Sequence, residues 1–343
     1  MHVFLYEWAT GGGLIDVPTG LPISLVREGT AMLGALAADI ARIEGCRVSV
    51  LRDPRVLGLS LPGCEIVDVI STTSGREEFE RLTAAADATI LIAPEFDGIL
   101  LKAARQAIAS GGRLASPGPD FIRIAADKHR TCERLAAAGV NVPSGVLLEP
   151  DEPLPNNFTY PAVLKPNDGA GSQDTYLVSG PRDTPPAYAW PRRLERFVPG
   201  MAASAAFLCG PADRTPLVPC RQRLSNDGRF HYLGGELPMA VGLAERAIQI
   251  ADRALAAMPP SAGFVGVDLV LGRNPDGADD AVVEINPRLT TSYVGIRAAA
   301  SSNLAHVMLQ ACKGEPTEVF FDPRRLEFDP EGHLSFLAET PRG

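Results

Sequence analysis

Residues 281–292 read AVVEINPRLTTS, and this stretch decides how the whole chain is interpreted. A carboxylate, Glu284, and a carboxamide, Asn286, stand two positions apart in a run that is otherwise largely apolar. Side chains two apart on a β-strand point to the same face of the sheet. The stretch therefore predicts a strand that presents two oxygen ligands side by side.

The segment just upstream carries a third oxygen ligand. Residues 263–272 read GFVGVDLVLG, in which Asp268 is the only acid among residues typical of a buried strand. Between the two strands, residues 274–277 read NPDG, which favours a turn and hence a hairpin. If the turn centres on Asp276, residue 268 pairs with residue 284, because both are equally far from the centre.

Three oxygen-bearing side chains without a neighbouring His or Cys suit a hard cation such as Mg²⁺, with Mn²⁺ as the alternative. Magnesium that has few protein ligands usually completes its shell with phosphates and waters. We therefore expect Asp268, Glu284 and Asn286 to form the metal side of a nucleotide site. The competing interpretation is that Asp268 and Glu284 are hairpin residues that face solvent.

A glycine-rich loop forms the second constellation, in residues 162–178, AVLKPNDGAGSQDTYLV. A strand that ends at Lys165 leads into Gly169, Gly171 and Ser172, and a second β-run follows. Glycines let the backbone N–H groups approach phosphate oxygens, and the lysine supplies a compact positive charge. Because the lysine precedes the glycines and no helix follows, the pattern is not GxxxxGK[ST]. It predicts a hairpin flap.

Two further segments are weaker taken alone. Residues 124–145, IAADKHRTCERLAAAGVNVPSG, predict an amphipathic helix that opens at Lys128 and stops at Gly139. Residues 192–200, RRLERFVPG, predict an extended linker before a Pro-Gly break, and its backbone groups could read an adenine edge.

Taken in chain order, the four segments resemble the ATP-grasp superfamily of carboxylate–amine ligases over residues 120–312. The resemblance implies ATP and Mg²⁺ as cofactors, a small-molecule carboxylate and an amine as substrates, and a homodimer as the common assembly. It also implies site residues by role. These are Lys128 and Lys165 on the ATP phosphates, Gly169 to Ser172 above them, Glu195, Phe197 and Val198 around adenine, and Asp268, Glu284 and Asn286 on two magnesium ions.

The chain departs from the superfamily pattern at two positions. Many members carry a ribose-binding Glu where this chain has Ala202, so ribose recognition must come from another group. Some relatives carry an Arg where this chain has Gly266. We therefore assign the stabilisation of anionic charge to Arg288, with Arg221 and Arg223 as second choices.

The chemistry that the resemblance implies is compatible with these residues. A substrate carboxylate attacks the γ-phosphorus of ATP, and an amine then attacks the acyl phosphate to give an amide, ADP and phosphate. Magnesium together with the catalytic residues Lys165 and Arg288 would offset the repulsion between carboxylate and ATP. Closure of the flap would exclude water, which hydrolyses acyl phosphates.

The start of the chain predicts a parallel sheet. Short apolar runs (VFLYE, RVSVL, EIVDVI and ATILIAPE) alternate with helical stretches at residues 28–44 and 98–110. Residues 6–13, YEWATGGG, follow the first strand, and we expect this loop to close over the non-nucleotide substrate through Glu7 and Thr10. A dinucleotide turn, hence a dehydrogenase, is a weaker alternative because GxGxxG spacing is missing. A flexible loop without a cofactor role is the other.

The expected fold class is α/β, with α+β character in the ATP-clamp half. We expect an N-terminal substrate (pre-ATP-grasp) domain in residues 1–119, a small subdomain with the flap in residues 120–193, and a subdomain with the metal site in residues 194–343. Residues 320–343 mix charges and prolines and are expected to form a surface extension.

A closer resemblance links YEWATGGG and EINPRLTTSYVG to the tyramine–glutamate ligase branch, which implies glutamate as the acid and a methanofuran-type cofactor pathway. Pyrrolysine-type amino-acid ligases are near neighbours within the same chemistry. The competing functional class is a nucleotide-binding protein that has lost turnover and acts through a partner, an alternative raised by Ala202 and Gly266.

Composition excludes other classes. The chain has 343 residues, 45% hydrophobic and 21% charged, enough for two or three compact units. A net charge of −9 without a basic block argues against nucleic-acid and anionic-membrane binding.

No apolar run is long enough to span a bilayer and no basic signal-peptide region opens the chain, so we expect a cytoplasmic protein. The cysteines lack CxxC spacing and the histidines lack paired spacing, which favours reduced thiols over a zinc site.

Overall fold

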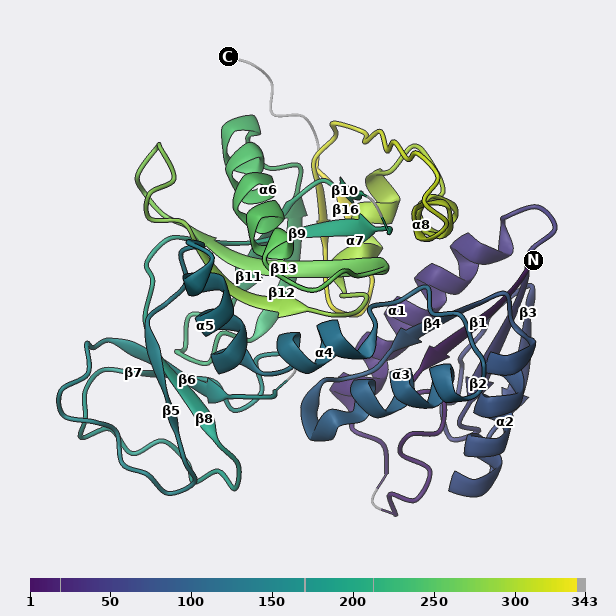
Figure 1. Ribbon diagram of the computed structural model, residues 1–343, viewed down its shortest axis with the longest axis horizontal. Coiled ribbons are helices and arrows are strands. Elements are labelled where there is room, and N and C mark those ends of the chain that lie inside the picture. The colour runs from purple at the N-terminus through teal and green to yellow at the C-terminus, as the bar shows by residue number, and fades with distance from the viewer. Residues whose placement is uncertain (19, 170, 212, 338–343) are drawn as a thin grey trace.

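The N-terminal part of the chain forms a parallel sheet, as the alternation of apolar runs and helical stretches predicts. The computed structural model describes residues 1–18, 20–169, 171–211 and 213–337. The strands lie in the order β3-β2-β1-β4 (Figure 1). Their bounds are β1 His2–Glu7, β2 Arg47–Arg52, β3 Cys64–Asp68 and β4 Ala88–Ile92, and the helices beside them are α1 Ile23–Ala41, α2 Thr72–Ala85 and α3 Ile99–Ala109.

Successive residues of β1 pack on opposite faces of this sheet. Val3 and Leu5 share an apolar cluster with Leu36 of α1, whereas Phe4 shares another with Phe79 of α2. Because helices cover both faces, β1 is apolar without alternation, as is usual for a parallel strand. The carboxyl ends of β1 and β4 lie at the same edge of the sheet, where Glu7 ends β1.

A small antiparallel sheet follows two helices, α4 and α5. The helices are α4 Pro119–Ala125 and α5 Lys128–Ala137, and the strands are β5 Gly145–Leu148, β6 Ala162–Pro166, β7 Tyr176–Val178 and β8 Arg192–Arg196, in the order β5-β8-β6-β7. Strands β6 and β7 pair antiparallel on either side of the glycine-rich loop, so the predicted hairpin is confirmed. Ala170, inside that loop, lies outside the described residues.

The third sheet is the largest and carries the predicted metal hairpin. Its order is β14-β13-β9-β11-β12-β15-β16, and β10 pairs with β9. The strands are β9 Met201–Cys209, β10 Arg214–Pro216, β11 Cys220–Leu224, β12 Tyr232–Leu237, β13 Gly263–Leu271, β14 Ala281–Asn286, β15 Leu326–Phe328 and β16 Leu334–Phe336. The helices are α6 Val241–Ala256, α7 Ser292–Ala299 and α8 Leu304–Cys312. In Figure 1, α6 lies on one side of this sheet and β5 to β8 lie below it.

The expectation of a surface extension in residues 320–343 is wrong at strand β15, whereas the other described residues of this segment are exposed or half-buried. Strand β15 pairs with β12, and the side chains of Leu326 and Phe328 are buried in the main apolar cluster. Three-residue strands are too short to show a period in the sequence, so the pattern gave no signal. Residues 338–343 lie outside the described residues.

A buried ionic network joins the first sheet's helix α1 to the third sheet's helix α7. Asp39 of α1 accepts hydrogen bonds from Arg297 Nε at 2.7 Å, Arg297 Nη2 at 2.5 Å and Tyr293 Oη at 2.7 Å. Asn303 Nδ2 donates to the carbonyl oxygen of Asp39 at 2.6 Å. This network, called the Asp39 junction below, holds the N-terminal sheet against the helix that follows the metal hairpin.

Two further expectations concern membrane spans and thiols. Within the described parts of the chain, no helix is both long and apolar enough to cross a membrane. The six cysteines are free thiols, as expected. Burial raises the pKa of Cys209 and of Cys220 to about 12, so these two are protonated at neutral pH.

Candidate active site

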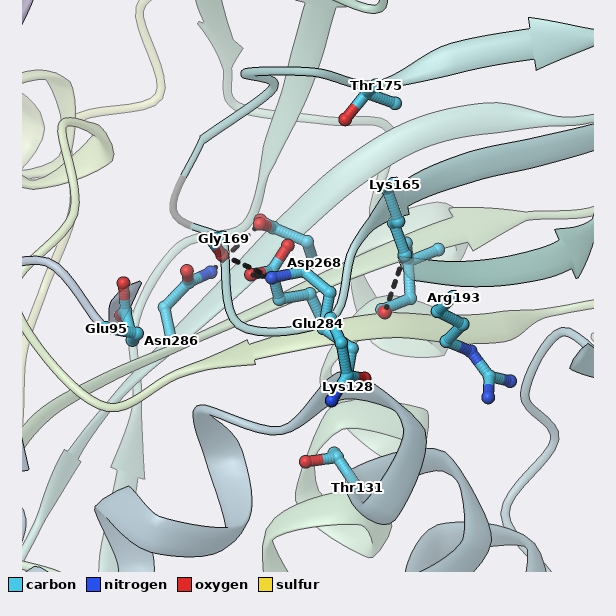
Figure 2. A network of polar contacts seen from close by, with 12 residues as sticks. Glu95, Lys128, Thr131, Lys165, Gly169, Thr175, Arg193, Asp268, Glu284 and Asn286 are labelled. Carbon is cyan, nitrogen blue, oxygen red and sulfur yellow. Dashed lines mark hydrogen bonds and ion pairs between the residues drawn. The ribbon is translucent and has the colours of Figure 1, made fainter. Parts of the chain in front are cut away.

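The hairpin of β13 and β14 places residue 268 opposite residue 284, as predicted, although its register shifts by one residue between Asp268 and Leu269. Asp268 pairs with Glu284, and Gly266 pairs with Asn286. Asn286 Nδ2 donates a hydrogen bond to Asp268 Oδ2 at 2.9 Å. Figure 2 shows these three ligand side chains gathered together, with Lys128 and Lys165 close by. The three predicted metal ligands therefore lie together.

The electrostatics of Asp268 are those of a carboxylate that lacks a cation. Gln222 Nε2 donates to Asp268 Oδ1 at 2.8 Å, so both carboxylate oxygens accept from neutral amides. Burial and the charge of Glu284 together raise the pKa of Asp268 to about 6, and the two amide hydrogen bonds and the charge of Arg288 oppose the rise. A divalent cation would offset this repulsion, so the donor set fits Mg²⁺.

The candidate metal site has few protein ligands. The described residues contain no group of three or more His, Cys, Asp and Glu side chains placed to hold a metal ion. The candidate set has two carboxylates and one carboxamide, and further ligands would have to come from phosphates and water.

Lys128 opens α5, as predicted, and its ammonium group reaches the metal hairpin. Its Nζ lies 2.9 Å from Glu284 Oε1 and also donates to the carbonyl oxygen of Gly169. Asn167, at the base of the flap, fixes this start of the helix: its carbonyl accepts from Lys128 N at 3.0 Å and its Oδ1 from His129 N at 2.9 Å. The flap and α5 are thus connected at their bases.

Lys165, at the end of β6, is buried beside Glu195 of β8. The Nζ to Oε1 distance is 2.6 Å, and the other Glu195 oxygen accepts from Arg193 Nε at 2.9 Å. Burial alone would lower the pKa of Lys165, but the charges of Glu195 and Glu284 outweigh burial and raise it. Lys165 therefore stays cationic. Glu195, predicted to hold adenine, lies here as the counter-ion of this lysine.

The remaining adenine candidates lie on the linker between β8 and β9. Phe197 and Val198 are half-buried, and the Phe197 ring stacks on Phe230 with centroids 6.3 Å apart. The N–H of Phe197 donates to the carbonyl of Pro161 at 3.0 Å. Neither residue contacts the metal hairpin through a hydrogen bond within the described parts of the chain.

Arg288 lies beside the metal hairpin, and its guanidinium pairs with a carboxylate that sequence reasoning did not identify. Arg288 Nε lies 2.9 Å from Glu95 Oε1, in the loop after β4. A Cβ at Gly266 would come within 3.1 Å of Thr290 Cγ2, so a larger side chain there would require Thr290 to shift. The charge-stabilising role of Arg288 stays a prediction.

The second-choice arginines are engaged elsewhere. Arg221 pairs with Glu236 at 3.6 Å, and Arg223 pairs with Glu327 at 3.1 Å. Both line a hollow of about 650 Å³ together with Ala202. Between the two arginines in sequence, Gln222 is the residue of β11 that contacts the metal hairpin, through its hydrogen bond to Asp268. Strand alternation would have placed Gln222 on the opposite face from the arginines, but nothing in the sequence marked that face.

The loop after β1 is a packed turn, so the flexible-loop interpretation is wrong. Glu7 is buried and accepts from Ala9 N at 3.1 Å, Thr10 N at 2.7 Å and Thr10 Oγ1 at 2.7 Å. Gly12 has φ +94° and lies against Val69, a position where a Cβ would clash. The three glycines open no helix, since α1 begins only at Ile23, which also removes the basis for a dinucleotide turn.

Comparison with known proteins agrees with this architecture. Residues 46–120 match the pre ATP-grasp 3 domain and residues 125–292 match the ATP-grasp domain. The tyramine–L-glutamate ligase of Methanocaldococcus jannaschii is 22% identical over 323 residues, covering 91% of this chain and 90% of the relative.

Two solved structures share the fold. A putative ATP-grasp superfamily protein from Archaeoglobus fulgidus superposes with a TM-score of 0.72 at 21% identity, covering 100% of this chain and 95% of that one. The L-amino acid ligase from Bacillus licheniformis superposes with a TM-score of 0.68 at 16% identity, covering 95% and 78%. The predicted fold class, α/β with an N-terminal parallel sheet and α+β character in the second half, is confirmed, and the sheets of the second half are antiparallel.

Proposed function

From the premise that this chain belongs to the ATP-grasp carboxylate–amine ligases, we propose that it joins glutamate, or a closely similar amino acid, to an aromatic amine such as tyramine. The proposed pathway is the synthesis of a methanofuran-type cofactor. One observation carries the proposal: Lys128, Lys165 and the three predicted metal ligands meet at one place between two sheets. The near full-length likeness to a tyramine–L-glutamate ligase supports the choice of substrates.

In the proposed reaction, a carboxylate oxygen of the acid attacks the γ-phosphorus of ATP, and the bond to ADP breaks. The amine nitrogen then attacks the carbonyl carbon of the acyl phosphate, loses a proton, and expels phosphate. Magnesium, held by Asp268, Glu284 and Asn286, would neutralise phosphate charge. No side-chain nucleophile is needed.

The two lysines of the site form ion pairs with glutamates, and these glutamates could be replaced by ligand phosphates. Lys128 is bonded to Glu284, so each neutralises the other. We infer that ATP phosphates replace Glu284 as the ion-pair partner of Lys128, so that Glu284 can bind the cation. Lys165 stays cationic beside Glu195 and would stabilise the charge on the transferred phosphoryl group.

The flap would keep water from the acyl phosphate. Gly171 has φ +66°, which favours glycine, and the carbonyl of Gly169 accepts from Lys128 Nζ. In the proposal this bond breaks when phosphate binds Lys128, and the loop then closes over the nucleotide.

An ADP-release assay tests the proposal. Protein, ATP and Mg²⁺ are combined with pools of amino acids and amines that include glutamate with tyramine or tyrosine. We expect ADP release that requires both an acid and an amine and that falls by at least about 10³-fold in Glu284→Ala. Glu245→Ala, which removes an exposed carboxylate on α6, is the matched control and should retain full activity.

The competing function is nucleotide binding without turnover. It is favoured by Ala202, where many relatives have a ribose-binding glutamate. ATP binding without ADP release from any pool would establish that alternative and overturn the ligase proposal.

A further inference from the structure

The Arg288 guanidinium is held by a carboxylate from a different sheet. Glu95 lies three residues beyond the end of β4, and its two oxygens accept from Arg288 Nε at 2.9 Å and from Nη2 at 3.2 Å. The exposed fraction of the side chain is 13% for Arg288 and 4% for Glu95. Two parallel hydrogen bonds between buried groups fix the plane of a guanidinium as well as its position.

Counting donors shows that part of Arg288 remains available. A guanidinium has five N–H groups. Glu95 accepts from two of them, and the carbonyl of Leu289 accepts from Nη1 at 3.2 Å. Within the described parts of the chain, one N–H on each terminal nitrogen is therefore left for a ligand. Two neighbouring N–H groups match the two oxygens of a carboxylate or a phosphoryl group.

Arg288 lies between the metal hairpin and the turn after β1. Burial raises the pKa of both Asp268 and Glu7, and the charge of Arg288 opposes the rise in each case. One of these carboxylates belongs to the metal hairpin and the other to the edge of the parallel sheet. Figure 2 shows Glu95 on the Asn286 side of the site, away from Lys165. The unused N–H groups thus belong to a cation close to both the metal hairpin and the turn after β1.

Glu95 itself is fixed by a loop with three anchors, residues 94–98, called the Glu95 loop. Leu100 N donates to the carbonyl of Pro94 at 3.0 Å. The ring of Phe96 packs edge-on against Trp8, in the turn after β1, with centroids 6.2 Å apart. Asp97 N donates to Asp168 Oδ2, next to the flap, at 3.3 Å. The loop therefore contacts the turn after β1, the residue that precedes the flap, and Arg288.

We propose that Glu95 is a positioning residue for the ligation: it orients Arg288 so that the two unused N–H groups bind the carboxylate as it becomes phosphorylated. The inference rests on the proposed ligase function. It extends that function by making the N-terminal sheet part of the catalytic apparatus, because the loop after β4 sets the orientation of a cation on the metal strand.

The test is steady-state kinetics of Glu95→Gln. The amide keeps the shape of the side chain, but it can accept from Arg288 with only one oxygen and presents its NH₂ to the guanidinium. We expect kcat to fall roughly 10- to 100-fold while KM for ATP changes less than twofold. Glu95→Asp should recover part of kcat. Asp97→Asn, which removes an exposed carboxylate from the same loop, is the matched control and should leave kcat unchanged.

A double variant separates positioning from support of the fold. If Glu95 acts through Arg288, Glu95→Gln adds almost no further loss to Arg288→Lys, because the oriented guanidinium is already gone. Additive losses, an unchanged kcat in Glu95→Gln, or a rise in KM for ATP alone would overturn the inference and leave the ligase function intact. An inactive wild-type protein would instead overturn the proposed function, and the positioning role with it.

Discussion

Asp39 is buried and Asp268 is half-buried, and the charges that surround the two carboxylates differ. Asp39, at the junction of α1 and α7, accepts from both Nε and Nη2 of Arg297 and from the hydroxyl of Tyr293. Asp268 accepts from the amides of Gln222 and Asn286 and faces a second carboxylate, Glu284.

The difference separates a structural network from a binding site. The Asp39 junction is electrostatically complete, because a cation from this chain lies against the carboxylate. At Asp268 the nearest partners are neutral, and the charge balance requires a cation from outside. The two aspartates can thus be told apart by whether the chain itself provides the counter-charge.

The largest expected effect concerns Asp268, the carboxylate without a counter-charge of its own. Asp268→Asn removes a metal ligand while keeping its shape, and we expect ligase activity to fall by roughly 10³-fold, since a bound metal supplies several kcal/mol of charge stabilisation. ADP release at saturating Mg²⁺ measures this. Activity within tenfold of wild type would show that Asp268 does not bind the cation.

The second effect concerns the Asp39 junction and the stability of the fold. Asp39→Asn leaves Arg297 without its counter-charge, and we expect the free energy of unfolding to fall by about 3 kcal/mol. Denaturant unfolding gives this value. The kcat measured well below the unfolding temperature should change less than tenfold, because the junction contacts no predicted metal ligand through a hydrogen bond in the described residues. Unaltered stability would contradict the assignment of this network as structural.

A smaller effect on the free energy of unfolding, opposite in sign to that of Asp39→Asn, is expected at Asp268. The fold raises the pKa of Asp268 to about 6, so the folded protein binds this proton more tightly than the unfolded chain does. Stability of the metal-free protein therefore falls as pH rises from about 4 to about 6 and stays lower above that range. We expect Asp268→Asn to be more stable than wild type by roughly 1 to 2 kcal/mol at pH 8, after allowing for screening by solvent.

This gain should disappear below about pH 4, where Asp268 is protonated in both states. Unfolding in the presence of a chelator, compared across pH 4 to 8, measures it. Asp39→Asn provides the contrast, since it should be destabilised at pH 8. A destabilised Asp268→Asn at pH 8 would show that its carboxylate already has a counter-charge within the chain.

The smallest effect tests whether solvent, rather than geometry, makes the Asp39 junction important. Arg52 donates to the two carboxylate oxygens of Asp68 from Nε at 2.7 Å and from Nη2 at 3.0 Å, as Arg297 donates to both oxygens of Asp39, but this pair lies at the surface. We expect Asp68→Asn to change the free energy of unfolding by no more than about 0.5 kcal/mol. A loss comparable to that of Asp39→Asn would mean that burial is not what separates the two pairs.

Short-range regularities explain what could be predicted from the sequence. The hairpin and the opening of α5 at Lys128 follow from local turn and helix patterns, whereas the register shift beside Asp268 left no mark in the sequence. The parallel sheet follows from the alternation of element types. Strands β15 and β16 could not be predicted, because each has three residues; β15 pairs with β12, far away in the chain, and β16 pairs with β15.

By itself, then, the sequence determined the local geometry of the candidate metal ligands and of the flap, because turn position and the two-residue period of a strand act within a few residues. Only the tertiary structure decided which side chains complete that geometry. Gln222 reaches Asp268 across 46 positions, and Glu95 reaches Arg288 across 193. Such partners depend on the order of strands in a sheet and on how one sheet packs against another. These are set by the burial of apolar faces over the whole molecule, and no local pattern records them.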